Sequence, residues 1–466
     1  MKSINTLVVN FENAYALKGL PFFQKELPGF KVVGLVARNI DLSVHTQYAQ
    51  LPIYEKNLSI DNLINYSPKS DFSAPLQEYL LPFEEQIHYH VNRYFDTTLA
   101  FDYSLIRQKI IYYALDIIKN TQAGLLYFGV TPHDPLSYLL CLIGHHLGIK
   151  VVILSRCDAL NSYQLYEEIG DHINYVKNAP QELDSGVVKY KHKHVESSLL
   201  ALTKSEPSYM VKQKRDGGSL MKKLRYNLFV KKRVTLSGWQ RYKKKKAQKN
   251  VYTDLVSISN ENELKSLEKK ILYFPLHFQP ELTTSPDGGM FSQQWSAIKA
   301  VADNFKEGYV ILVKEHPSQF LINSKHVRSE LFYKGILSIG SNIKLVSLDL
   351  SSEKILKQTS GVITITGTVG FEAILNEKPV LFFGDAKYNT IRGAFNFLKE
   401  GDLAVFAQHV DGAQTFNKSE VINDFMKLAE SKFYFCYDKK EAHEVRHLKA
   451  IKALLSEYQT YMYSTL

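Results

Sequence analysis

The chain has 466 residues, of which 45% are hydrophobic and 22% charged, as in an ordinary soluble globular protein. One hydrophobic core rarely serves more than about 300 residues, so a single compact domain is excluded and we expect two domains with an insertion. The net charge is +10, but residues 211–249 alone carry +14, from 15 Lys and Arg against one acid, and the rest of the chain sums to −4.

We find neither the signal peptide or membrane span of an exported protein nor the residue pattern of a metal site. The first residues, Met1–Asn5, do not begin a signal peptide, and the most apolar window, Leu136–Leu154, is interrupted by His145, His146 and Lys150. The two adjacent histidines point about 100° apart on a helix and cannot chelate one ion together. Three cysteines without a CxxC pair favour a reducing compartment. We therefore expect a cytoplasmic protein that requires no metal and no other cofactor.

The N-terminal half alternates short runs rich in Val, Leu and Ile with stretches of helical periodicity. Such alternation is typical of parallel strand–helix–strand units. A helix is predicted at Ser137–Leu147, and a possible further strand at Asn174–Lys177. The predicted strands are Thr6–Asn10, Lys31–Ala37, Gly124–Phe128 and Lys150–Leu154.

The basic segment separates this half from a second alternating run. Apolar residues at helical spacing in Met221–Lys232 predict a basic helical insertion. Beyond it we predict helices at Phe291–Asn304, Ser352–Gln358 and Val369–Asn376 and a helical C-terminus. The predicted strands are Ile271–Pro275, Tyr309–Lys314, Ile343–Val346, Gly361–Thr366 and Pro379–Phe383. The predicted division is an N-terminal domain (1–208), the insertion (209–250), a C-terminal domain (251–440) and a final helix (441–466).

The strongest motif is a buried strand that runs through a Thr/Gly turn into a helix, at Gly361–Leu375. Free N–H groups at a helix N-terminus favour a phosphate, and the hydroxyls of Thr366 and Thr368 can add hydrogen bonds. Gly367 lets the backbone approach a ligand closely, and Glu372 can face a ribose hydroxyl pair. The alternative is an ordinary turn with a threonine N-cap and a capping-box glutamate.

A second motif delivers a basic residue and a histidine into a loop. The strand that ends at Lys314 is followed by His316 and by Pro317, which stops the strand from pairing further. We expect Lys314 and His316 to contact a nucleotide phosphate. The alternative is a solvent-exposed strand end.

The loop after the strand at 271–275 holds Gln279, Glu281 and Asp287. A carboxylate in such a loop can serve as the general base that deprotonates an acceptor hydroxyl. We rank Glu281 ahead of Asp287, because the two glycines that follow Asp287 can equally mark a tight turn. Gln279 is a candidate contact to the nucleotide.

In the N-terminal half, the loop Val130–Pro135 lies between a predicted strand and a predicted helix. It can present His133 and Asp134 to an acceptor, and we include His133 among the catalytic candidates. The alternative is a structural loop in which Asp134 caps the helix that follows.

At these motifs the chain resembles bacterial capsule and surface-polysaccharide glycosyltransferases that use CMP-activated acidic sugars, such as Kdo transferases and nonulosonate transferases. The segments YFPLHFQPELTT, VKEHP and TGTVGFEAILNEKPV carry most of the likeness, and TPHDPLSYLL is similar to an N-terminal element of that group. The resemblance implies an α/β fold of the GT-B type, with two doubly wound Rossmann-like domains facing a cleft. It places the acceptor site in the N-terminal domain and the nucleotide-sugar site in the C-terminal one.

The resemblance also implies roles for individual residues. His316, Pro317, Thr366 and Thr368 would bind the CMP phosphate, and an acidic residue of the preceding loop would be catalytic. The acidic-acidic-Gly triplet common in bacterial sialyltransferases is here Pro286–Gly288, with a single acid.

We therefore predict transfer of an acidic sugar, namely a nonulosonate (pseudaminic, legionaminic or sialic acid) or Kdo, from a CMP donor to a surface-polysaccharide acceptor that is a glycan or a lipid-linked glycan. The chain has no DxD metal motif. Residues 211–249 would dock on the anionic inner face of the cytoplasmic membrane. The alternatives are a UDP-sugar or CDP-glycerol transferase, a GT-B-like sugar-nucleotide epimerase and a non-catalytic assembly scaffold. A nucleic-acid-binding protein is disfavoured, because outside the basic segment the chain is slightly acidic.

Overall fold

In the computed structural model, the chain forms two compact units. One unit comprises Met1–Val195 and Met426–Leu466, and the other Glu196–Phe425. The predicted fold class, two Rossmann-like α/β domains with a basic helical segment, is confirmed, whereas the predicted domain limits stay predictions. The described residues are 3–9, 27, 29–37, 51–56, 58–71, 73–95, 100–157, 160, 162–169, 193, 195–199, 236–279, 281–320, 328–432 and 434–435.

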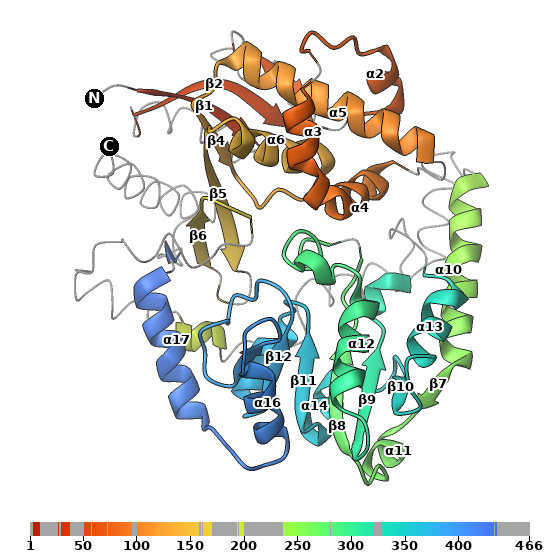
Figure 1. Ribbon diagram of the computed structural model, residues 1–466. Coiled ribbons are helices and arrows are strands. Elements are labelled where there is room, and N and C mark those ends of the chain that lie inside the picture. The colour runs from red at the N-terminus through yellow and green to blue at the C-terminus, as the bar shows by residue number, and fades with distance from the viewer. Residues whose placement is uncertain are drawn as a thin grey trace, which may run out of the picture. The chain divides into compact units, whose positions relative to one another are not determined.

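The N-terminal unit is built on a seven-stranded sheet of order β14-β6-β5-β4-β1-β2-β3 (Figure 1). The five strands from β5 to β3 are parallel, whereas β6 and β14 pair antiparallel. The last strand brings the chain back from the C-terminal unit to this sheet. The strands are β1 (Ile4–Val9), β2 (Phe30–Ala37), β3 (Ile53–Glu55), β4 (Leu125–Phe128), β5 (Lys150–Cys157), β6 (Ser162–Tyr166) and β14 (Tyr434–Phe435).

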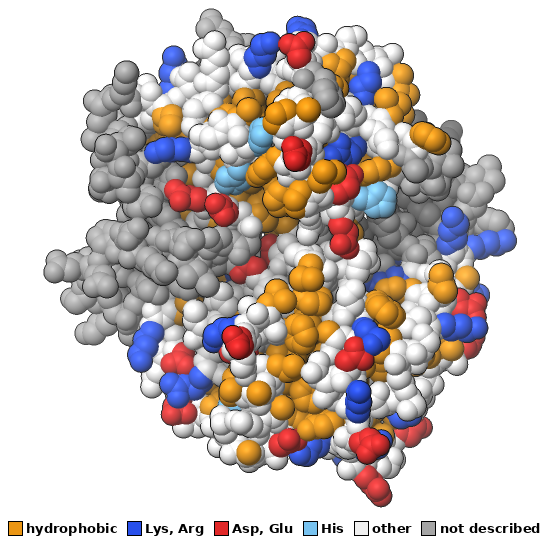
Figure 2. All heavy atoms as spheres, viewed as in Figure 1, with side chains coloured by type: hydrophobic (Ala, Val, Ile, Leu, Met, Phe, Trp, Pro, Cys, Tyr) orange, Lys and Arg blue, Asp and Glu red, His pale blue; other side chains and the backbone are white. Residues whose placement is uncertain are grey.

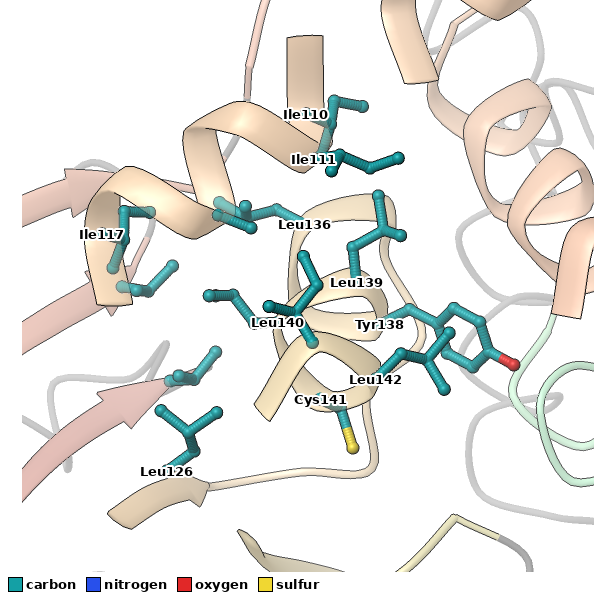
Figure 3. Close-up of a cluster of buried hydrophobic side chains, with 14 of the residues drawn as sticks. Ile110, Ile111, Ile117, Leu126, Leu136, Tyr138, Leu139, Leu140, Cys141 and Leu142 are labelled. Atoms are coloured by element: carbon teal, nitrogen blue, oxygen red, sulfur yellow. The ribbon is translucent and has the colours of Figure 1, made fainter. Parts of the chain in front are cut away.

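Helices cover this sheet and supply most of its core. The long α5 and the almost wholly buried α6 turn their apolar side chains toward one another and toward β4, as Figure 3 shows for Ile111, Leu139 and Leu126. Burying a side chain of this size stabilises the fold by about 1.5–3 kcal/mol. The described helices are α2 (Ile60–Asn65), α3 (Ala74–Leu80), α4 (Glu84–Tyr94), α5 (Ala100–Thr121) and α6 (Pro135–His146).

The C-terminal unit is built on a second seven-stranded sheet, all parallel, of order β13-β12-β11-β8-β9-β10-β7. The strands are β7 (Val256–Ile258), β8 (Lys270–Pro275), β9 (Tyr309–Lys314), β10 (Ile343–Val346), β11 (Gly361–Thr364), β12 (Val380–Phe382) and β13 (Ala394–Asn396). The helices are α10 (Leu236–Asp254), α11 (Glu261–Lys265), α12 (Gln294–Asn304), α13 (Glu330–Leu337), α14 (Ser352–Gln358), α15 (Val369–Leu375), α16 (Asp402–Val410) and α17 (Lys418–Lys432), the last of which runs on into the other unit.

The order of these strands reverses beside β8. The chain runs outward from β8 through β9 to β10, then returns to the other side of β8 with β11 and continues to β12 and β13. In parallel sheets, ligands bind outside the carboxyl ends of the strands at such a reversal. A ligand is therefore expected at the loops that follow β8, β9 and β11.

The helix α10 is the described part of the basic segment. Lys245, Gln248 and Tyr252 are spaced three and four residues apart, so they share one face, and all three are buried. Lys245 Nζ donates to the Gln319 carbonyl at 2.7 Å, and Gln248 lies 3.4 Å from the Tyr333 hydroxyl. This face packs on the C-terminal unit, so α10 is an integral part of that unit. The predicted helix Met221–Lys232 lies outside the described residues.

The elements predicted from the sequence agree with the structure apart from their ends. All nine strands predicted with definite limits are present, as β1, β2, β4, β5, β8, β9, β10, β11 and β12. The helix predicted from Phe291 begins instead at Gln294, because Gly289–Phe291 form a 3-10 turn and Gln293 is extended. The possible strand Asn174–Lys177 and the helix predicted at 441–466 lie outside the described residues. Of the helices that the structure describes, none has the length and apolarity needed to span a bilayer.

Candidate nucleotide-sugar site

The ends of β8, β9 and β11 are joined by a network of buried side chains. Arg328, which precedes α13, donates through Nη1 to both carboxylate oxygens of Glu315 at 2.6 Å. Its Nη2 donates to the His277 carbonyl at 2.7 Å and to Gln279 Oε1 at 3.0 Å. One guanidinium therefore fixes the residues that follow two neighbouring strands.

Glu315 is satisfied from several directions, although it is almost completely buried. Besides Arg328, the Tyr333 hydroxyl donates to its Oε2 and the His316 N–H to its Oε1, both at 2.7 Å. Its own N–H donates to the Tyr252 hydroxyl at 3.0 Å. A buried carboxylate is tolerated only when it is paired and hydrogen-bonded in this way. Glu315 is thus a structural anion that anchors the loop carrying His316.

His277 extends the network to β11. The Ile365 N–H donates to its Nε2 at 3.2 Å, so Nε2 is unprotonated and accepts a second bond from the Thr364 hydroxyl at 2.9 Å. Nδ1 carries the hydrogen and faces Thr283 Oγ1 at 3.2 Å. Burial, with the charges of His316 and Arg328, lowers the pKa of His277 to about 3. His277 therefore stays neutral and positions the turn after β11.

His316 has the opposite hydrogen-bonding arrangement. The Ser318 N–H donates to its Nδ1 at 3.2 Å, so the hydrogen of the neutral ring lies on Nε2. Within the described part of the chain, Nε2 makes no hydrogen bond, and the ring is partly exposed beside Phe278, with ring centroids 6.0 Å apart. Burial and the charges of Arg328 and Lys314 lower the pKa of His316 to about 4. The ring thus offers one N–H donor in a region of positive potential.

The neighbours of His316 differ from the sequence expectation in one respect. Pro317 begins a 3-10 turn, Pro317–Phe320, which ends the strand as expected. Lys314 is buried, and its Nζ donates to the Leu350 carbonyl at 2.5 Å. Its charge therefore acts on His316 from within the protein rather than from an extended surface side chain.

The turn after β11 holds the Thr/Gly residues predicted to bind phosphate. The Thr366 hydroxyl donates to the Thr283 carbonyl at 2.8 Å, whereas Thr368 is exposed and makes no capping hydrogen bond. Gly367 is required by packing, because a Cβ there would lie 2.8 Å from Thr364 Oγ1 and 3.1 Å from His277 Cε1. The capping-box alternative is wrong, since N3 of α15 is Phe371.

Glu372 lies one position later, at the end of the first turn of α15. Its carboxylate makes no hydrogen bond or ion pair with any described residue, and burial raises its pKa to about 7. A half-buried carboxylate left open to partners can accept hydrogen bonds from a ligand hydroxyl pair.

The two carboxylates of the loop after β8 occupy different environments. Glu281 is exposed, and its Oε2 lies 3.4 Å from Thr283 Oγ1. Asp287 is buried, and burial raises its pKa to about 6 despite a smaller lowering effect of Lys387. The Asp385 N–H donates to the Asp287 carbonyl at 2.7 Å, which holds this loop against the residues after β12. Asp287 therefore has the environment expected of a base that works near neutral pH, whereas which of the two carboxylates is catalytic stays a prediction.

Gln279 is bonded within the protein at both ends of its side-chain amide. Its Nε2 donates to the Ser292 carbonyl at 2.8 Å and its Oε1 accepts from Arg328, so both ends of the amide are engaged within the protein. We interpret Gln279 as a residue that shapes the loop.

In the N-terminal unit, the loop after β4 is organised by its aspartate. Asp134 is the N-cap of α6, accepts from the Ser137 N–H at 3.0 Å and pairs with the buried Lys56 at 3.1 Å. The capping alternative for Asp134 is thus confirmed. His133 donates through Nδ1 to the Thr131 carbonyl at 2.7 Å, and burial lowers its pKa. Its role as a catalytic residue stays a prediction.

Comparison with known proteins bears on the C-terminal unit. Residues 204–419 match the model of a family described as "Capsule polysaccharide biosynthesis protein", a stretch that spans nearly all of Glu196–Phe425. The C-terminal unit is similar to capsule polysaccharide biosynthesis proteins. The match supports the predicted resemblance as far as a glycosyltransferase-like protein of capsule assembly. It does not address the nucleotide of the donor. Among curated proteins, no sequence matches this chain.

Solved structures with a related chain path include a Thermosulfurimonas dismutans KpsC, titled beta Kdo 2,7 transferase, at 13% identity, a TM-score of 0.31 and coverage of 77% of this chain and 97% of that one. A Rickettsia bellii UDP-N-acetylglucosamine 2-epimerase has 11% identity, a TM-score of 0.29 and coverage of 100% and 99%. Because these TM-scores are low, the assignment of the fold rests on the strand order of the two sheets.

The two oppositely charged residues at the centre of the network were absent from our sequence candidates. Glu315 stands between Lys314 and His316, and its carboxylate is buried, whereas the alternative prediction for this motif was a solvent-exposed strand end. Arg328 lies outside every motif, 13 positions from its partner. The only available signal was the apolar run before Glu315, since an acid that directly follows a buried strand needs a cation nearby.

The Glu315–Arg328 pair yields a stability prediction. Arg328→Met removes the guanidinium and leaves Glu315 buried without its cation, which costs about 3–5 kcal/mol. Lys334→Met is the matched control, because Lys334 forms an exposed pair with Glu330 worth about 0–1 kcal/mol. Urea unfolding of both variants measures the difference. Equal, small losses in the two variants would show that the buried pair does not hold the site together.

Proposed function

We propose that the protein transfers an acidic sugar, a nonulosonate or Kdo, from a CMP donor to a surface-polysaccharide acceptor, without a metal ion. The observation that carries the proposal is the His316 ring, whose Nε2–H is open in a region made positive by Lys314 and Arg328. The phosphate of CMP would accept a hydrogen bond from this N–H and from the Thr368 hydroxyl, and Glu372 would accept from the ribose hydroxyls. The capsule family match supports the pathway but leaves the nucleotide open.

Asp287 is the proposed base of the transfer. Its carboxylate takes the proton of the acceptor hydroxyl, the acceptor oxygen bonds to the anomeric carbon, and the bond between that carbon and the CMP phosphate breaks with its electron pair leaving on the phosphate. A base of pKa about 6 is mostly ionised at neutral pH and still basic enough to assist. The exposed Glu281 is the second candidate.

The competing functions separate by simple measurements. Stabilisation by UDP but not CMP would favour a UDP-sugar transferase or an epimerase, and stabilisation by CDP-glycerol would favour a polyol-phosphate transferase. Ligand binding raises stability by an amount set by the ratio of concentration to Kd, so thermal shifts rank the nucleotides directly. A non-catalytic scaffold would release no CMP from any CMP-sugar.

The first functional prediction concerns nucleotide binding. Replacing His316 by Ala removes a hydrogen bond to a charged phosphate, worth about 1.5–3 kcal/mol, so CMP affinity falls by about 10- to 150-fold. Replacing it by Gln keeps an N–H₂ donor near the position of Nε2 and retains part of the affinity. Calorimetry with CMP measures both, with His88→Ala on the other unit as the control. Unchanged affinity in the His316→Ala variant would remove this residue from the site.

The second functional prediction concerns the catalytic base. Asp287→Asn lowers kcat by about 10²–10⁴-fold with CMP affinity nearly unchanged, whereas Glu281→Gln has little effect. Because the raised pKa of Asp287 is about 6, the wild-type rate rises with pH through that value as the carboxylate ionises. The residual rate of the Asp287→Asn variant lacks this rise. CMP release over pH 5–8 provides the measurement, and the reverse pattern in the two variants would assign the base to Glu281.

We further propose that the basic segment docks on the anionic inner face of the cytoplasmic membrane. On α10, Lys243, Lys244, Lys246 and Lys249 are exposed, and basic side chains stand at the right-hand edge of Figure 2, where Figure 1 has this helix. Each near-surface Lys or Arg contributes about 1 kcal/mol at an anionic bilayer. Docking would bring the site to lipid-linked acceptors.

The variant that tests membrane docking leaves Lys245 unchanged, because its ammonium is hydrogen-bonded inside the unit. Changing the four exposed lysines of α10 to Gln lowers binding to anionic vesicles at least several-fold at low salt, and high salt abolishes the difference. The control changes Lys265, Lys334, Lys354 and Lys357 to Gln, an equal loss of charge elsewhere on the unit. Co-sedimentation measures binding. Equal losses in the two variants would indicate a response to net charge rather than docking through α10.

A further inference from the structure

The N-terminal unit contains a pocket apart from its loop at His133. It has a volume of about 350 Å³ and lies between α2, the end of β3 and α5, two helices that pack together in Figure 1. Binding sites for small molecules have volumes of about 300–1,000 Å³, so the pocket can hold one sugar ring. No motif of the sequence pointed to it.

Two tyrosines form a rigid wall of this pocket. The rings of Tyr66 and Tyr113 meet edge to face with centroids 5.2 Å apart. The Tyr66 hydroxyl donates to Asp116, and Lys109 Nζ donates to the Tyr66 carbonyl at 2.6 Å. The Tyr113 hydroxyl accepts from the backbone N–H of Glu55. Because both hydroxyls are held, the rings offer fixed apolar surfaces against which the C–H face of a pyranose can pack.

The α2 side of the pocket supplies polar groups that are open to a ligand. Asp61 and Asn65 lie four residues apart on α2, so their side chains share one face of the helix. Both are exposed lining residues, and neither makes a side-chain hydrogen bond or ion pair with another residue in the described ranges. A carboxylate and an amide at this spacing can accept from, and donate to, adjacent sugar hydroxyls.

The charge of the lining restricts the ligand. Glu55 and Asp61 are both acidic, and the described residues that line the pocket include no Lys, Arg or His. A carboxylate or phosphate on the ligand would therefore be repelled, whereas a neutral sugar is accepted and an amino sugar is attracted.

We propose that this pocket binds a neutral or amino sugar of the acceptor glycan. Its role as an acceptor subsite rests on the proposed function, whereas the binding of the sugar does not. The acidic sugar would then belong to the donor, and the pocket would select a non-acidic residue of the chain that receives it.

The test uses saturation-transfer NMR on the full chain with three probes: the methyl glycosides of N-acetylglucosamine, glucosamine and glucuronic acid. The first two give saturation signals and the glucuronide gives none. Asp61→Ala/Asn65→Ala lowers the signals at least five-fold, while Asp71→Ala, an exposed aspartate of the same unit that does not line the pocket, leaves them unchanged. Alanine is a better helix former than Asp or Asn, so α2 persists in the double variant.

Three results would overturn the proposal: no signal from the first two sugars, equal signals in the double variant, or an equal signal from the glucuronide. CMP titrated into the same samples reports on the other unit. Sugar binding without CMP binding would refute the proposed donor and leave the pocket standing, and the opposite result would refute the pocket alone.

Discussion

The candidate site depends on one buried guanidinium. Arg328 joins Glu315 after β9 to the His277 carbonyl and to Gln279 after β8, and the His277 ring in turn receives two hydrogen bonds from the turn after β11. Side chains thereby join the ends of three strands at the reversal of the sheet, in addition to the backbone pairing of β8 with β9 and β11. Without the cation, Glu315 would be a buried charge, and its desolvation would favour a rearrangement of the loop that carries His316.

This arrangement separates the groups that hold the site from those that remain open to a ligand. The polar side-chain atoms of His277, Gln279 and Glu315 bond within the protein, to Arg328 and to residues of neighbouring loops. His316 Nε2 and the Glu372 carboxylate make no such bonds with the described residues, although both are at least half buried. Their shifted pKa values have the same cause, which is burial without a compensating partner. Ligand sites are commonly found where such groups converge.

The fold was predictable because its strands are buried on both faces and therefore appear as continuous apolar runs between helical stretches. The site was predictable only in part. The motifs that follow the predicted strands pointed to His316, Thr366 and Glu372. Sequence does not reveal which of two acids in one loop is buried, so Glu281 was ranked ahead of Asp287. Arg328 could not be found, since its role depends on the tertiary contact with Glu315 and not on any local pattern.

Charge distinguishes the candidate sites of the two units. At the strand ends of the C-terminal unit, burial lowers the pKa of His316 most, and the positive charges of Arg328 and Lys314, which lower it further, would attract an anion. In the N-terminal unit, the pocket beside Tyr113 is lined by two carboxylates and by no described cation. An anionic donor sugar is therefore disfavoured in the pocket, and an amino sugar is disfavoured at the strand ends. Electrostatic complementarity of this kind contributes more to specificity than to affinity, because the wrong partner is rejected by repulsion.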